Sequence, residues 1–284
     1  MVSIGAIQIK IDQELCIRCY KCTPYCPVEA IIVNRGNTII DQNRCVDCGV
    51  CIRSGICDME AIYLPETPWP RAIRAAFSGG GFSYNIKEKM WNEKGERQYD
   101  RLWDKMPLPK MTFNDLKKFT KNGLTGGGRG TLEMKNNDKS GRYRKGEVGV
   151  ACELGRPCIG FYWRDFEKVS MAIAEMGVEF EKENPASQLI DLKTGAIKPD
   201  YIEIMDEKCL SAIVEFKVSI EKVVDIYKRI MNVAKDIDTI FSLSFINKCE
   251  KGFPPLIKIM EENGIRYRIN GKTNIGLGRP LYDT

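Results

Sequence analysis

The spacing of the cysteines constrains this chain more than any other feature. Eight of its twelve cysteines fall within the first 57 residues, in two runs. Three thiolates separated by two residues each can hold one face of an iron–sulfur cube, whereas a tetrahedral zinc site draws its four ligands from two well-separated pairs. The spacing therefore favours iron–sulfur clusters over zinc. The first run is Cys16, Cys19, Cys22 and Cys26, followed by Pro27; the second is Cys45, Cys48, Cys51 and, after five further residues, Cys57.

The two runs lie in duplicated halves. Ile11-Asp12-Gln13 before the first run recurs as Ile40-Asp41-Gln42 before the second, and Glu29-Ala30-Ile31 after the first recurs as Glu60-Ala61-Ile62. Alignment of both flanks identifies Cys57 as the counterpart of Cys26, with two residues inserted before it. Each half predicts a strand, a cysteine loop, a short helix and a second strand. The expected strands are Ala6–Ile11, Ile31–Val33, Thr38–Ile40 and Ile62–Leu64.

The absence of histidine excludes several chemistries. Haem ligation by histidine, Rieske-type ligation, histidine-based zinc hydrolysis and Ser–His or Cys–His nucleophile pairs all need this residue. No stretch approaches the roughly 20 apolar residues that span a bilayer, and the N-terminal residues lack a signal-peptide pattern. We therefore expect a cytoplasmic protein without a membrane span, in which clustered cysteines are metal ligands rather than disulfides.

The first 64 residues resemble the bacterial-type two-cluster ferredoxins. The resemblance lies in the C-x2-C-x2-C-x3-C-P run at Cys16–Pro27 and its altered repeat, which has Asp58 in place of proline. It implies two 4Fe–4S clusters and one-electron transfer at low potential, with the fourth cysteine of each run binding the opposite cluster. The implied ligand sets are Cys16, Cys19, Cys22 and Cys57 for cluster 1, and Cys45, Cys48, Cys51 and Cys26 for cluster 2.

Residues 65–146 form a basic connecting or docking segment that contains glycine, proline and tryptophan. It carries 18 basic and 9 acidic side chains, a net charge of +9 within a chain of net charge +5. A helix is expected from Thr112 to Lys121. The run after it suits either a flexible connector or an anion site, because backbone N–H groups of a glycine-rich loop can hold a phosphate. The candidate anion-site residues are Gly126, Gly127, Gly128 and Arg129.

Residues 147–284 predict an α+β domain. The expected strands are 147–154, 177–181, 209–218, 238–246 and 265–269, and the expected helices are 165–176, 219–234 and 254–263. Similar sequences begin the first two helices, Phe166–Val169 and Ile220–Val223, which suggests a tandem pair of units similar to the ferredoxin-like or ACT-like sandwich. The stretch from Arg129 to Asp165 also resembles anaerobic iron–sulfur reductases of the 6-hydroxynicotinate reductase kind.

These features lead to three hypotheses about function. The first is a low-potential electron-transfer subunit or accessory protein of an anaerobic redox enzyme, docking on a partner protein. The second is an iron–sulfur oxidoreductase in its own right, acting on a small molecule with a flavin. The third is a regulator in which an ACT-like tail senses a small molecule and the clusters sense redox state or oxygen. Nucleic acid is not an expected partner, since no recognition helix is evident, and a homo-oligomer is left open.

Overall fold

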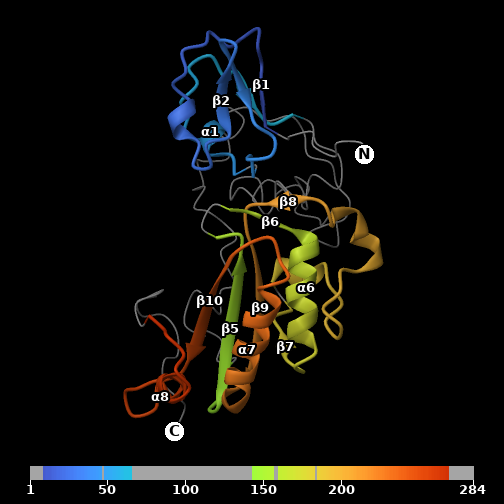
Figure 1. The fold of residues 1–284 in the computed structure, drawn as a ribbon, viewed down its shortest axis with the longest axis vertical. Coiled ribbons are helices and arrows are strands. Elements are labelled where there is room, and N and C mark those ends of the chain that lie inside the picture. Colours follow the sequence, from blue (N-terminus) through green and yellow to red (C-terminus); the bar gives the residue numbers. More distant parts are fainter. Residues whose placement is uncertain (1–8, 47, 66–142, 157–158, 183, 269–284) are drawn as a thin grey trace, which may run out of the picture. The chain divides into compact units, whose positions relative to one another are not determined.

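The computed structural model describes residues 9–46, 48–65, 143–156, 159–182 and 184–268 (Figure 1). The expected helix at 112–121 and the candidate anion-site residues Gly126–Arg129 lie outside these ranges. The chain divides into two compact units. The cysteine-rich unit contains the N-terminal part together with Pro157–Trp163 and Glu203–Ser211, and the sandwich unit contains Arg129–Arg156, Arg164–Ile202 and Ala212–Thr284.

The cysteine-rich unit is built on two short antiparallel ladders. Strand β1 (Lys10–Ile11) pairs with β4 (Ile62–Tyr63), and β2 (Ile31–Asn34) pairs with β3 (Asn37–Ile40). The four strands occur where the duplicated sequence predicts them. Each ladder joins a strand of the first half to a strand of the second, so the two halves are interleaved. Their shared core consists of small and β-branched side chains together with one leucine, namely Ile9, Ala30, Ile31, Ala61, Ile62 and Leu64.

The short helices of this unit lie earlier in each half than the sequence predicts. The 3-10 turn η1 (Thr23–Tyr25) and the helix α1 (Val50–Arg53) both precede the fourth cysteine of their run, whereas the expected helix follows it. After Cys26 and Cys57 the chain reverses at Glu29 and Glu60, whose φ values are +52° and +50°. This left-handed conformation ends any helix and returns the chain directly to a strand.

The two other segments of the cysteine-rich unit form a small ribbon. Strand β6 (Phe161–Tyr162) pairs antiparallel with β8 (Lys208–Cys209). Phe161 and Cys209 are buried, and the Lys208 ammonium lies 5.9 Å from the centre of the Tyr162 ring. No sequence pattern indicates that these residues, which are remote from the cysteine runs, belong to the same unit.

The sandwich unit contains one four-stranded antiparallel sheet of order β10-β5-β9-β7. Helices α6 and α7 run alongside its strands in Figure 1. Its main elements are β5 (Glu147–Leu154), α6 (Trp163–Ala174), β7 (Glu179–Phe180), β9 (Ala212–Ser219), α7 (Val223–Val233), β10 (Phe241–Asn247) and α8 (Pro255–Glu262). The 3-10 turns η2 (Pro185–Gln188) and η3 (Pro199–Ile204) lie between β7 and β8, and η4 (Ile220–Lys222) precedes α7.

The expectation of two sandwich units in tandem is wrong for the described residues. One half contributes β5 and β7, and the other contributes β9 and β10. In the sheet, β9 lies between β5 and β7, and β5 lies between β10 and β9. This is the split β-α-β arrangement of a single unit. The similar starts of α6 and α7 therefore belong to equivalent helices of one sheet. Local sequence similarity revealed the repeated element but not the interleaving.

The burial pattern of β5 explains how the sheet packs. Val148, Val150, Cys152 and Leu154 on one face of β5 are completely buried, and the residues between them are buried as well, so both faces of this strand are covered. Helix α6 buries Phe166, Val169 and Ile173. Helix α7 buries Val223, Ile226, Ile230 and Val233.

The strand expected at 265–269 is not present in its described part, residues 265–268. Two residues after the end of α8, Gly264 has φ +66°, and its N–H donates to the carbonyl of Glu261 at 3.1 Å. The N–H of Ile265 then donates to the carbonyl of Met260 at 2.8 Å. These two bonds close the C-terminus of the helix. They also occupy the N–H of Ile265, which a strand starting there would need for pairing with a neighbouring strand.

Candidate iron–sulfur centres

The first cavity of the cysteine-rich unit brings together three cysteines of the first run and one of the second. Cys16, Cys19 and Cys22 line it from the loop after β1, and Cys57 lines it from the segment before β4. Cys19 is exposed and the other three thiols are partly buried. This is the set that the resemblance implies for cluster 1.

The second cavity has the reciprocal composition. Cys45, Cys48 and Cys51 come from the loop after β3 and from α1, and Cys26 comes from the first run. Cys45, Cys48 and Cys51 are all buried, unlike their counterparts in the first run. Each of the eight predicted ligands thus lines the same cavity as the three cysteines expected beside it.

The fourth cysteine of each run is held by the same backbone contact. The N–H of Ala30 donates to Sγ of Cys26 at 3.1 Å, and the N–H of Ala61 donates to Sγ of Cys57 at 3.3 Å. The left-handed residues before these alanines, Glu29 and Glu60, turn the N–H groups back toward the sulfur atoms. Hydrogen bonds of this kind stabilise a thiolate and tune the potential of a cluster bound to it.

Two equivalent aspartates anchor the cysteine loops. The N–H of Asp12 donates to the carbonyl of Ala61 at 2.8 Å, and the N–H of Asp41 donates to that of Ala30 at 2.7 Å. Their own carbonyls accept from Cys16 and Cys45, both at 3.0 Å. Each loop therefore begins on the half that supplies its fourth cysteine, which fixes the crossing of the ligands.

The loops contain left-handed residues where the chain curves around each cavity. Arg18 and Tyr20 have φ values of +58° and +60°, and Gly49, the counterpart of Tyr20, has φ +69°. Such residues turn successive N–H groups toward one side, the arrangement that binds anionic groups, iron–sulfur clusters included. Arg18 donates to Asn37 at 3.0 Å, and the Tyr20 hydroxyl donates to the carbonyl of Gly36 at 3.1 Å.

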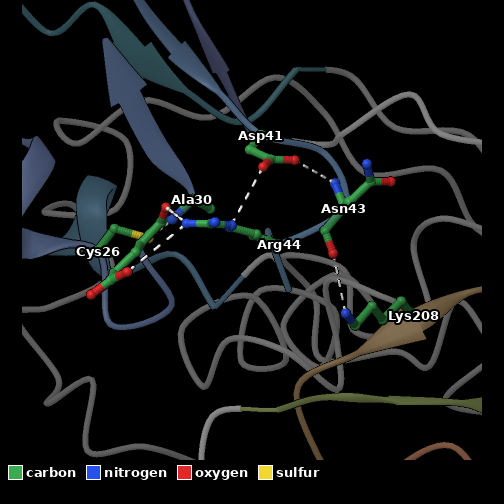
Figure 2. Close-up of polar contacts among 7 residues, drawn as sticks. Cys26, Ala30, Asp41, Asn43, Arg44 and Lys208 are labelled. Atoms are coloured by element: carbon green, nitrogen blue, oxygen red, sulfur yellow. Dashed lines mark hydrogen bonds and ion pairs between the residues drawn. The ribbon is translucent and has the colours of Figure 1, made fainter.

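Arg44 links the second loop to the segment that follows Cys26 (Figure 2). Its Nε lies 3.5 Å from a carboxylate oxygen of Asp41, and its Nη1 donates to the carbonyl of Glu29 at 3.4 Å. In the same view, the Lys208 ammonium donates to the carbonyl of Asn43 at 3.3 Å. Sequence reasoning identified neither contact, because the duplicated positions of the first half carry Leu15 and Glu14 instead of Arg44 and Asn43.

Burial acts on the thiols of both cavities. Burial raises the pKa of Cys51 to about 12, with smaller contributions from Cys48 and Cys26. Burial also raises the pKa of Cys22. These thiols therefore need a positively charged group to become thiolates near pH 7.

The remaining cysteines line neither of these cavities. Cys152 in β5 and Cys209 in β8 are buried, and Cys249 is partly buried. Cys158 lies outside the described residues. Burial is usual for a small apolar side chain such as that of cysteine.

Comparison with known proteins bears on the first run directly. Residues 9–32 match the family of 4Fe-4S binding domains. This part of the chain is a 4Fe-4S ferredoxin domain. The chain is also 42% identical over 40 residues to Ferredoxin-1 of Rhodobacter capsulatus, and the same identity holds for a second Ferredoxin-1 sequence from that species.

The extent of these matches is limited. The aligned residues are 14% of this chain and span 62% of the length of each ferredoxin. No solved structure matches the chain. The match supports the binding of at least one iron–sulfur cluster. No helix among the described residues has the length and apolar character needed to cross a membrane.

Proposed function

We propose that the protein binds two 4Fe–4S clusters and transfers electrons at low potential, as a subunit or accessory protein of an anaerobic redox enzyme. The observation that carries the proposal is the reciprocal lining of the two cavities. Each receives three cysteines from one run and the fourth from the other. Cys16, Cys19, Cys22 and Cys57 would hold one cluster, and Cys45, Cys48, Cys51 and Cys26 the other.

The residues around the cavities have defined tasks in this proposal. A bound cluster supplies reversible one-electron chemistry. The eight cysteines hold the two clusters in place, the N–H groups of Ala30 and Ala61 stabilise the thiolates of Cys26 and Cys57, and the anchored aspartates keep the two loops in register. Few groups need to move, which suits electron transfer without bond making.

The rest of the chain supports a role beside a larger partner. We propose that residues 65–146, with their net charge of +9, dock on that partner, and that residues 147–284 form a separate α+β domain. Two segments of that domain, Pro157–Trp163 and Glu203–Ser211, pack with the cysteine-rich unit instead. A small, self-contained carrier would need neither of these regions.

Metal analysis of the full chain, purified without oxygen, tests the proposal. We expect about eight iron atoms and about eight acid-labile sulfides per chain, with an EPR signal from reduced 4Fe–4S clusters after dithionite treatment. Zinc with little iron or sulfide would refute it. About four irons per chain after full reconstitution would refute the two-cluster part alone.

A further inference from the structure

The duplicated halves differ strongly in exposure at one pair of equivalent residues. Ile17 follows Cys16 as Val46 follows Cys45, yet Ile17 is 64% exposed and Val46 is 1% exposed. The reason lies in the β6–β8 ribbon. A Cβ placed on Gly160, just before β6, would lie 2.8 Å from a methyl carbon of Val46, so the glycine backbone packs directly against this side chain.

The ribbon also reaches the second loop through polar contacts. Lys208 of β8 donates to the carbonyl of Asn43, two residues before Cys45 (Figure 2). The chain's own segments therefore cover the second cysteine loop, and Cys45, Cys48 and Cys51 are buried. The first loop receives no equivalent cover from the described residues, because Ile17 and Cys19 are both exposed.

The exposed loop carries an apolar patch, which we define as Ile17, Tyr20 and Met59. All three side chains line the first cavity and all three are exposed. Of the charged groups beside them, Lys21 pairs with Asp58 at 2.9 Å, whereas Arg18 keeps its positive charge and donates to the amide oxygen of Asn37 at 3.0 Å. An exposed apolar surface of this kind suits a partner that offers an apolar contact.

We propose that the apolar patch is the docking surface of a redox partner protein, which covers Ile17 as the β6–β8 ribbon covers Val46. This inference rests on the proposed function. The partner presents a small-residue turn beside its own one-electron centre and exchanges a single electron with the centre held by Cys16, Cys19, Cys22 and Cys57. No bond forms or breaks, and the electron lost by one protein is gained by the other. The covered centre exchanges electrons through its exposed neighbour.

The first test needs no partner. A dysprosium chelate added to the reduced full-chain holoprotein speeds the relaxation of EPR signals from centres near the surface. We expect a clear effect on the signal of the centre bound by the Cys16 loop and a much smaller effect on the other. Assignment comes from the Cys57→Ser and Cys26→Ser variants. Equal effects on both signals would overturn the inference that only one centre is exposed.

The second test measures docking with a soluble c-type cytochrome as one-electron acceptor. Ile17→Asp and Ile17→Lys should each slow its reduction by about tenfold, because a charge of either sign must be desolvated in an apolar contact. The matched controls are Val33→Asp and Val33→Lys on β2. Val33 is 47% exposed and does not line the cavity, so these variants should stay within about twofold of the wild type.

The outcomes separate this inference from the proposed function. Iron and sulfide are measured first, and a protein that lacks them fails the proposed function. A loaded protein whose Ile17 variants behave like the Val33 variants would overturn the docking surface. Opposite effects of Asp and Lys would overturn its apolar character. A wild-type dimer in sedimentation that Ile17→Asp dissociates would show that a second copy occupies the patch, which would also overturn the proposal.

Discussion

Lys21 and Asp58 form an ion pair that ties the first cysteine loop to the residue after Cys57, with 2.9 Å between Nζ and Oδ2. The second half has no equivalent, because the corresponding residues are Val50 and Pro27. The hydrogen bond to Asp58 raises the pKa of Lys21, and the same bond lowers the pKa of Asp58. Both groups therefore stay charged from about pH 5 to pH 9.

The Lys21–Asp58 pair should affect the midpoint potential of the centre in the first cavity only. Lys21→Met removes a positive charge and should lower the midpoint potential of the centre in the first cavity by about 20 mV, while Asp58→Asn should raise it by a similar amount, since exposed charges are strongly screened. Potentiometric titration followed by EPR measures both. The double variant should return close to the wild-type value, and a change confined to the second centre would contradict the prediction.

Replacement of Cys26 or Cys57 by serine should affect the cluster of a different cavity in each case. Cys57→Ser should weaken the centre otherwise bound by the first run, and Cys26→Ser the centre bound by the second run, because each residue lines the cavity of the other half. Iron content should fall toward about four per chain in each variant, and the two residual EPR spectra should differ. Cys249→Ser is the control, since Cys249 lines neither cavity. Identical residual spectra would argue against the crossing.

Cluster assembly should depend on pH through the buried thiols. Burial raises the pKa of Cys51 to about 12, whereas a free thiol has a pKa of about 8.5. Cluster assembly must therefore remove a proton that the buried thiol holds tightly at neutral pH. Reconstitution of the second cavity should therefore be faster at pH 9 than at pH 7, and slower than that of the first cavity at pH 7. The stability of the apo protein should have the opposite dependence on pH. Because the folded state holds the proton of Cys51 more tightly than the unfolded state, the free energy of unfolding falls as pH rises from the ordinary thiol pKa toward about 12. Stopped-flow absorbance at several pH values, with circular dichroism of the apo protein, measures both trends.

The sandwich unit depends on a buried polar contact. The side-chain amide of Asn184 donates to a carboxylate oxygen of Glu215 at 2.6 Å, and Glu215 is 1% exposed. Asn184→Leu should lower the free energy of unfolding by about 2–3 kcal/mol, because a buried carboxylate loses a donor. Urea denaturation checks this value. Asn232→Leu on the exposed side of α7 is the control and should change stability by less than about 0.5 kcal/mol.

Local repetition in the sequence identified the equivalent cysteines, but it gave no signal for the architecture around them. The repeated flanking segments identified Cys57 as the counterpart of Cys26, and the resemblance to two-cluster ferredoxins supplied the expected pairing of each with the opposite run. The packing of Gly160 on Val46 could not be predicted, since the two residues are 114 positions apart and neither belongs to a recognisable motif. The end of α8 could have been predicted, because Asn263-Gly264 is a common helix stop. The apolar residues after it, however, follow a pattern that is also typical of a strand.

The pairing of β1 with β4 and of β2 with β3 has a consequence for the origin of the cysteine-rich unit. A peptide of half its length would hold two strands with no ladder between them and four cysteines, of which three share one cavity and the fourth belongs to the cavity of the other half. Two identical copies, however, could complete both ladders and both ligand sets at once. An ancestor of this domain would then have worked as a symmetric dimer, and fusion of the two copies would have freed each loop to diverge, one toward enclosure and the other toward contact with other molecules.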